Sequence, residues 1–156
     1  MLKILISGSL FLILISSFGQ KAEYSRFDSS SQINSSICIK ALTYSKEINK
    51  YNFDKSAFDS LAIYLLENKS VYIEVSCFSD FTDMPLINLM ATKEQANEIR
   101  YYLVKKGVEG SRIATLGNGD MFPLYNEFEL ENMSIDEKNA ANLANRRIEI
   151  KIIKKG

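Results

Sequence analysis

The spacing of apolar residues changes along this chain, and that change restricts the fold more than any other feature. In residues 70–77, SVYIEVSC, apolar and polar side chains alternate with a period of two, as in a half-buried strand. In residues 53–68, FDKSAFDSLAIYLLEN, the apolar spacing is helical: Phe58, Leu61, Ala62 and Leu65 share one face. Switching between the two periods predicts a sheet covered by helices.

The same patterns predict four strands, over 37–44, 70–77, 111–117 and 146–153, with Ile148, Ile150 and Ile152 on the covered face of the last. They also predict three helices. The first covers 53–68, the second runs from a Thr92–Gln95 capping box to Gly107, and the third covers 134–145 after a capping box at Ser134. We therefore expect a two-layer α+β sandwich in which helices cover one face of a four-stranded mixed sheet.

Composition excludes several classes of function. The chain has 156 residues, which suits one domain, and its formal net charge of zero gives no support for nucleic-acid binding. It contains no His, so neither a Ser-His-Asp nor a Cys-His catalytic arrangement can form, and two Cys cannot build a Cys₄ zinc site. Asp80 and Asp83 lack the further ligands of a calcium loop. We expect no enzymatic activity, no catalytic residue, no metal and no cofactor.

The N-terminus is typical of a secretory signal peptide. Lys3 precedes an apolar run from Ile4 to Ile15, and Ser17 and Gly19 fit a cleavage site before Gln20. The run is shorter than the ~20 residues that span a bilayer, although an uncleaved anchor is the alternative. We predict a signal peptide over 1–19, a Ser-rich linker over 20–36 and a domain over 37–156, with no transmembrane segment in the mature chain.

Two cysteines lie on the first two predicted strands. A helical crossover makes those strands parallel, which would place Cys38 and Cys77 at opposite ends of the sheet. A disulfide requires Cα atoms within ~7 Å, so the favoured interpretation is two buried free thiols rather than a bridge.

Three stretches carry a resemblance to a known family. They are IEVSCFSD at 73–80, INLMATKEQANEIRYYLVKKGVEGSRIATLGNGDMFP at 87–123 and NRRIEIKI at 145–152. From about Ile37 onward the chain resembles the OmpA-like C-terminal domain, whose family includes peptidoglycan-associated lipoproteins and flagellar-motor stator domains. The stretches are similar to that family's Gly-His-Thr-Asp loop, its Asn–Leu-Ser–Arg-Ala helix and its closing Asn-Arg-Arg strand. The resemblance implies the order βαβαβ(α)β.

The resemblance also implies a function. Members of the family bind the peptide stem of peptidoglycan without covalent chemistry, typically at diaminopimelate, whose zwitterionic side chain needs both a carboxylate and a cation or donors. The implied protein is exported to the periplasm, with association to the outer membrane as one option, and it anchors or organises the cell envelope. The alternative is a degenerate copy that keeps the fold but binds an envelope protein partner instead of peptidoglycan.

Matching positions give the candidate site. Asp80 corresponds to the loop Asp, Ser79 replaces the preceding Thr, Thr82 lies in the same loop and Asn88 corresponds to the helix Asn. For the closing Arg pair, strand alternation favours Arg146 as the ligand-binding member. It is expected beside Ile148 and facing the helices, with Arg147 and Glu149 facing out.

Departures from the family pattern concern the same loop and helix. Cys77 and Phe78 replace the loop Gly and His, and Asp83 replaces a loop Gly. Gln95 replaces the helix Arg, so it could donate only an uncharged hydrogen bond to a ligand carboxylate. Losing the charge predicts about tenfold weaker binding unless Arg146 compensates. Gln95 also has a purely structural interpretation, as the capping-box partner of Thr92.

Overall fold

The computed structural model describes residue 27 and residues 30–40, 43–45, 50–52, 55–81 and 83–156. The predicted signal peptide, residues 20–26 of the predicted linker and the candidate residue Thr82 lie outside this part of the chain.

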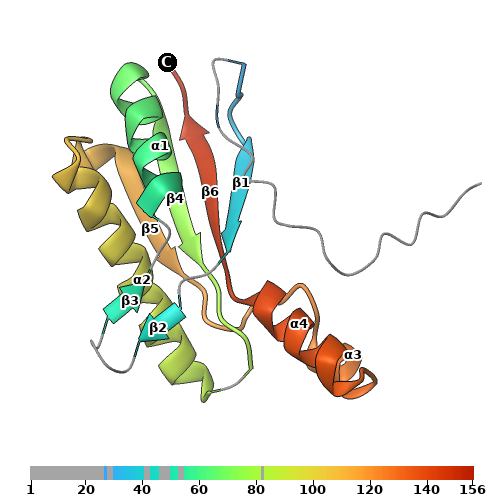
Figure 1. Cartoon of the computed structure of the whole chain (residues 1–156). Helices are drawn as coiled ribbons and strands as arrows, with labels where there is room; N and C mark the ends of the chain where they lie inside the picture. Colours follow the sequence, from blue (N-terminus) through green and yellow to red (C-terminus); the bar gives the residue numbers. More distant parts are fainter. Residues whose placement is uncertain (1–26, 28–29, 41–42, 46–49, 53–54, 82) are drawn as a thin grey trace, which may run out of the picture.

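A four-stranded mixed sheet forms the centre of the domain (Figure 1). Its strands are β1 (Ser36–Lys40), β4 (Tyr72–Cys77), β5 (Ile113–Gly117) and β6 (Arg147–Lys154), in the order β1-β6-β4-β5. β4 and β5 are parallel, whereas β6 runs antiparallel to both of its neighbours, β1 and β4. The last strand of the chain therefore lies inside the sheet.

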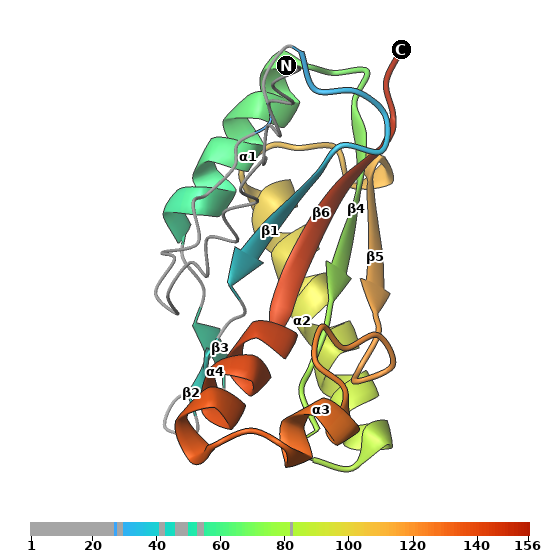
Figure 2. The ribbon, with the colours of Figure 1, turned by 90° about the vertical axis from the view of Figure 1, so that its right-hand side faces the viewer.

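Helices α1 (Lys55–Glu67) and α2 (Pro85–Lys105) cover one face of this sheet (Figure 2). The short helices α3 (Glu127–Glu131) and α4 (Ile135–Asn145) form an arm at the end of the sheet where β4 and β5 terminate (Figure 1). A 3₁₀ turn, η1 (Gly110–Arg112), precedes β5, and the pair β2 (Thr43–Ser45) and β3 (Lys50–Asn52) forms a separate two-stranded sheet. The predicted α+β class, with a four-stranded mixed sheet, is confirmed.

Alternating strand residues supply the core, as the period of two predicted. Val71, Ile73 and Val75 are fully buried, and so are Ile148, Ile150 and Ile152 on the neighbouring strand β6. From the other layer, Phe58, Leu65, Ile99 and Leu103 of the two helices are also fully buried. Fully burying one such side chain contributes ~1.5–3 kcal/mol, so the sheet and the helices stabilise each other mainly through this layer.

A buried arginine closes the C-terminal end of α1. Nη1 of Arg112 donates to the carbonyls of Asn68 and Val71, at 3.2 and 3.0 Å, and Nη2 donates to the carbonyl of Leu65 at 2.9 Å. The last carbonyls of a helix have no partners within the helix, and a cation is favoured there by the helix dipole. Arg112 thus fixes the end of α1 to the start of β5.

Part of the Ser-rich lead-in packs on the domain. The ring of Phe27 is buried against Tyr64, with 5.6 Å between ring centroids. Backbone hydrogen bonds also join Asn34 and Ser35 to Ile152 of β6. The described lead-in residues therefore extend the contact between the N-terminal strand and β6.

The predicted start of the second helix is wrong. α2 begins at Pro85, and Thr92 lies inside it, where its hydroxyl donates to the carbonyl of Asn88 at 2.9 Å. Proline suits the first helical turn because its missing N–H has no helical partner there. Thr92 and Gln95 therefore form no capping box. The expected stop at Gly107 is confirmed by its φ of 100°, as is the capping box between Ser134 and Glu137.

The first predicted strand is also shorter than expected. β1 ends at Lys40, and residues 43–45 pair with β3 in the second sheet. The alternation of 37–44 therefore spans two strands that lie in different sheets. α3, with its own capping box between Asn126 and Glu129, has no counterpart in the prediction.

The cysteines flank β6 at nearly the same level. Cys38 lies opposite Glu149 on one side of β6, and Cys77 lies opposite Ile148 on the other. The expectation of opposite ends of the sheet is wrong. β1 and β4 are parallel, as expected, but the pairing of β1 is shifted along β6, so that Cys38 in the middle of β1 lies level with Cys77 at the end of β4. Both thiols are free, as predicted, since two strand spacings of ~4.8 Å exceed disulfide reach. Cys77 is buried, which raises the pKa of its thiol, but Cys38 is exposed, contrary to the prediction.

α2 packs closely against β5 at Gly117. A Cβ at this position would lie 2.6 Å from Cα of Lys93, inside the helix backbone. We predict that Gly117→Ala lowers the free energy of unfolding by about 1–3 kcal/mol, because the backbone must shift to admit the methyl group. Urea unfolding measures this loss.

Gly110→Ala is the matched control for this prediction. Its Cβ would meet the end of the flexible Arg100 side chain, which can move aside. Equal stability of the two variants would contradict the close approach of α2 to β5.

Candidate functional site

The loop that follows β4 carries a buried carboxylate. Asp80 is only 1% exposed, and its Oδ2 lies 3.1 Å from Nε of Arg146, whose side chain is 46% exposed. Arg146 is the C-cap residue of α4, so it lies just before β6 rather than in it. The pair joins two segments far apart in the sequence and leaves the guanidinium half in contact with solvent.

Asn88, in the first turn of α2, fixes this loop. Its side-chain NH₂ group lies within hydrogen-bond distance of the carbonyls of Asp80 and Asp83, at 3.0 and 3.1 Å. It also lies 3.0 Å from Oδ2 of Asp120, while its own oxygen accepts a bond from the hydroxyl of Ser79. One buried amide therefore joins the loop after β4 to the turn after β5.

A second set of bonds joins the same turn to the helix. The backbone N–H of Gly119 donates to the hydroxyl of Thr92 at 2.9 Å, and the backbone N–H of Ser79 donates to the carbonyl of Gly119 at 2.7 Å. Gly119 has a φ of 55°, a conformation that glycine adopts without strain. The ends of β4 and β5 and the start of α2 are thus held together as one unit.

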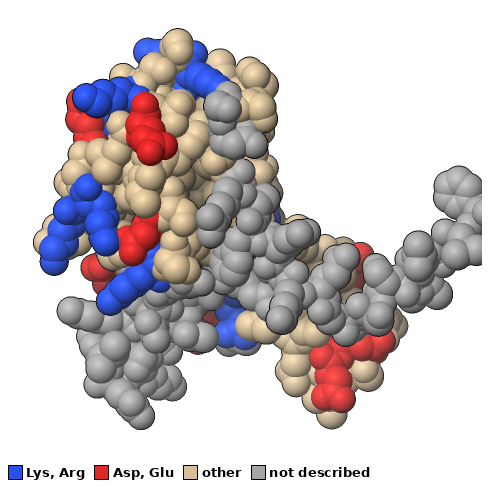
Figure 3. Space-filling model, turned by 45° about the horizontal axis from the view of Figure 1, so that its top comes forward, with Lys and Arg blue, Asp and Glu red and all other residues tan. Residues whose placement is uncertain are grey.

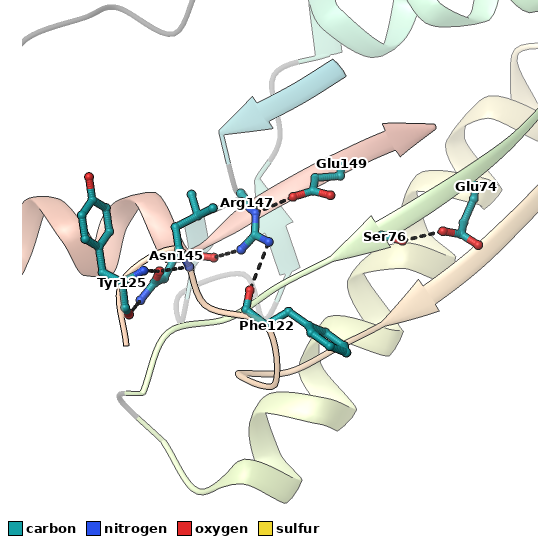
Figure 4. A network of polar contacts seen from close by, with 8 residues as sticks. Glu74, Ser76, Phe122, Tyr125, Asn145, Arg147 and Glu149 are labelled. Atoms are coloured by element: carbon teal, nitrogen blue, oxygen red, sulfur yellow. Dashed lines mark hydrogen bonds and ion pairs between the residues drawn. The ribbon is translucent and has the colours of Figure 1, made fainter. Parts of the chain in front are cut away.

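Arg147 and Asn145 organise the opposite side of the site (Figure 4). The Arg147 guanidinium pairs with Glu149 at 2.6 Å, donates to the carbonyl of Phe122 at 3.1 Å and lies 3.8 Å above the ring of Phe78. The fully buried amide of Asn145 accepts from the backbone of residues 124 and 125 and donates to the carbonyl of Tyr125. These two side chains attach the connection between β5 and α3 to the start of β6.

Two further observations define what the site can hold. Among the described residues, no group of three or more His, Cys, Asp and Glu side chains is arranged to bind a metal ion. A hollow of about 310 Å³ does exist, but it lies between α1 and β1 and is lined mainly by apolar residues such as Ile37 and Leu61. The hollow is therefore separate from the polar groups around Asp80.

Several solved structures are similar to this chain. The peptidoglycan-associated lipoprotein from Burkholderia pseudomallei matches with a TM-score of 0.56 and 20% identity over 74% of this chain and 87% of that chain. The periplasmic domain of Helicobacter pylori MotB matches with a TM-score of 0.61 and 19% identity over 87% and 83% of the two chains. The OmpA-like domain of FopA1 from Francisella tularensis matches with a TM-score of 0.53 and 16% identity over 75% and 70%.

The chain has the OmpA-like fold. Neither a family model nor a curated protein matches the sequence. At these identities the comparisons establish the architecture, and the residues of the candidate site must be judged from their own geometry.

In this OmpA-like fold, four of the six predicted site residues come together. Asp80, Ser79 and Asn88 form the loop and its support, and Arg146 pairs with Asp80. Gln95 lies on the same buried face of α2 as Asn88 and Thr92, about two turns further along the helix than Asn88. Its interpretation as a capping residue is contradicted, because Thr92 does not begin the helix. Thr82 lies outside the described residues.

Three residues of the site were missing from the predicted set. Asn145 and Arg147 belong to the NRR stretch, and the family resemblance would have been a sufficient signal for both. Arg147 does lie beside Glu149, as expected, but it is buried rather than facing solvent, because Phe78 and the chain near Phe122 cover it. Asp120 lies in the short NGD stretch after the third predicted strand, and no local pattern connects it with Asn88.

Asn88 provides a direct test of how the loop is held. We predict that Asn88→Ala lowers the free energy of unfolding by about 1–3 kcal/mol, because it leaves buried carbonyls of the loop without their donor. Amide hydrogen exchange should rise in residues 79–83 and 118–121 before it rises in the sheet.

Asn97→Ala is the matched control on the same helix. The Asn97 side chain accepts one exposed hydrogen bond, from Thr115, so its loss should leave both stability and exchange near those of the wild type. If Asn88→Ala behaved in the same way, Asn88 would not be the support of the loop.

Proposed function

We propose that this protein binds the peptide stem of peptidoglycan without covalent chemistry, through the loop that contains Asp80 and through Arg146. The observation that carries the proposal is the buried Asp80 carboxylate, with a cation beside it, in a fold that a peptidoglycan-associated lipoprotein shares. The expected partner is peptidoglycan with a diaminopimelate-type stem.

The pair of charges suits a zwitterionic side chain. A ligand ammonium can take the place of the Arg146 guanidinium at Asp80, and the displaced guanidinium can then receive the ligand carboxylate. Arg146 is free to make this movement because almost half of its side chain is in solvent. Charge-assisted hydrogen bonds of this kind are shorter and stronger than neutral ones, so two of them select for a ligand with both charges.

The location in the cell forms part of the same proposal. The leader-like N-terminus predicts export, and one of the similar structures is described as a periplasmic domain. We place the protein in the periplasm, where it would anchor or organise the cell envelope. Within the described residues, no helix combines the length and the apolar character needed to cross a membrane.

Asp80 tests the proposal directly. We predict that Asp80→Asn reduces co-sedimentation with purified sacculi at least tenfold, because the variant cannot offer a negative charge to the ligand ammonium. The melting temperature should stay close to that of the wild type, because the paired guanidinium already contacts water.

Asp83→Asn is the matched control, since it removes an exposed carboxylate from the same loop. It should sediment with sacculi like the wild type. The proposal fails if the wild-type protein stays in the supernatant, or if Asp80→Asn sediments as the wild type does. A large fall in the melting temperature of Asp80→Asn would instead assign Asp80 a structural role.

Gln95 tests which part of the ligand is recognised. We predict that Gln95→Arg strengthens binding to a diaminopimelate-containing muropeptide by about tenfold, because a charged donor replaces a neutral one on the buried face of α2. Isothermal titration calorimetry measures the change. Gln95→Met, which has a similar length but no charge, should not strengthen binding. If both variants bound alike, the position would not face the ligand.

A protein-interaction module without peptidoglycan binding is the second candidate function. The Arg146 guanidinium already pairs with Asp80, at the position that a ligand ammonium would take. Gln95 is uncharged, so α2 supplies no second cation there that could act in place of Arg146. A ligand must therefore compete with a pair that exists within the protein. Wild-type protein that fails to sediment with sacculi of any stem composition would favour this second function.

A further inference from the structure

β1 is an edge strand of the main sheet, and its outer edge is unpaired. Ile152 of β6 donates its backbone N–H to the carbonyl of Ser35 at 3.0 Å, and β6 is antiparallel to β1. Backbone groups of successive strand residues point to opposite sides, so Ile37 and Ile39 direct theirs to β6 and Cys38 directs its own away. Within the described part of the chain, no hydrogen bond reaches the outward N–H or carbonyl of Cys38.

The other edge of the sheet, formed by β5, is partly occupied by the chain itself. Ile113 donates its backbone N–H to the carbonyl of Gly110, and its own carbonyl accepts a bond from Nε of Arg100 at 3.3 Å. By the same alternation, only Thr115 and Gly117 direct further backbone groups of β5 outward. Open strand edges are templates for further pairing, so β1 is the edge at which a strand can be added.

The hollow of about 310 Å³ lies along the same edge. Its lining includes Ile37 and Ile39 of β1, Leu61 and Tyr64 of α1, and Phe27. None of the described residues that line it belongs to β4, β6 or α2, so the hollow opens on the outer side of β1. Figure 2 shows α1 extending past β1 on this side. The helix layer is therefore wider than the sheet, which leaves room for a further strand beneath α1.

We propose that this edge binds an extended segment of another protein as a fifth strand of the sheet. The backbone of the segment would pair with the outward groups of Ser36, Cys38 and Lys40. Its alternate side chains would point to the helix-covered face and enter the hollow, so they must be apolar like most of its lining. This proposal does not depend on peptidoglycan binding, because it uses neither Asp80 nor Arg146.

Charge sets one further requirement on the segment. Glu67, the last residue of α1, lines the hollow and forms no ion pair with a described residue. A Lys or Arg beside the apolar residues of the segment would therefore be favoured next to this carboxylate. The wider surface gives no reason to expect a strongly charged partner, because Figure 3 shows acidic and basic side chains mixed over the larger part of the domain.

Two other occupants fit this edge less well. A second copy that paired its own β1 here would bring its α1 into the same layer. Adjacent strands lie only ~4.8 Å apart, whereas two packed helices need ~8–10 Å, and each α1 already extends past its own β1. A lipid acyl chain could fill the hollow, but it offers no donor or acceptor to the strand edge. An extended peptide satisfies both the edge and the hollow.

The experiment uses the full chain, purified as the cell processes it, and a synthetic peptide of alternating Val and Thr that ends in Lys. Two further forms of the peptide carry N-methyl groups, either on every Val or on every Thr. Only alternate amides of an added strand face β1, so one methylated form should bind at least tenfold more weakly and the other like the unmodified peptide. Fluorescence anisotropy measures the affinities, and the form that fails reveals whether the added strand is parallel or antiparallel.

Cys38→Pro tests the edge within the protein. Proline removes the outward N–H of this residue, and a free edge is the position at which a strand tolerates it. The variant should bind the peptide at least tenfold more weakly. Thr115→Pro is the matched control, because it removes an outward N–H from β5, and it should bind like the wild type. Ser60→Leu fills the hollow and should also weaken binding at least tenfold.

Several outcomes would overturn the proposal. Circular dichroism identifies the folded variants, and wild-type binding by folded Cys38→Pro or by Ser60→Leu would contradict it. Equal binding of the two methylated peptides would do the same. Dimerisation in sedimentation velocity that Cys38→Pro abolishes would overturn it in favour of a second copy. Binding of lauric acid that Ser60→Leu abolishes, without any binding of the peptide, would overturn it in favour of an acyl chain.

Discussion

The position of β6 inside the sheet is the constraint on which the rest of the structure depends. Its three fully buried isoleucines face the helices, and its two edges supply the hydrogen bonds of β1 and β4. The register that sets Ile148 opposite Cys77 also directs the backbone N–H of Phe78 to the carbonyl of Arg147. The loop after β4 therefore receives its geometry from the end of the chain.

The sequence was sufficient where burial follows a regular period. Strands β1, β4 and β6 show it most clearly, because the apolar side chains that they bury are every second residue and this pattern cannot fit a helix. The start of α2 could not be predicted in this way. Met84 offers no side-chain cap, and the exposed residues from Leu86 to Met90 are as apolar as a buried face. Thr92 resembled a cap because its hydroxyl can bond to backbone in either role.

The site was predictable only in part. Family resemblance selected Asp80 and the closing Arg pair, and strand alternation then favoured Arg146. The structure places Asp80 and Arg146 in contact, although Arg146 precedes β6 and the alternation of that strand does not include it. The loop that carries Asp80 is supported by hydrogen bonds between residues distant in the sequence, such as the one from Asn88 to Asp120. Such a bond has no signature in either segment, because an Asn or Asp in a turn is equally common without a distant partner. The role of Phe78 was hidden for the same reason, since its partner Arg147 lies on the last strand.

The order of the strands has a consequence for how the sheet assembles as the chain is synthesised. β1 and β4 are both made before β6, yet neither pairs with the other, so each keeps an open edge until β6 is available. Contacts between such distant residues slow folding and leave strand edges exposed in the meantime. A chain that stopped before Arg147 would lack β6, the strand between β1 and β4. The missing part would therefore not be a dispensable tail. The presence of β6 is thus a condition for assembly of the sheet, and with it of the pair formed by Asp80 and Arg146.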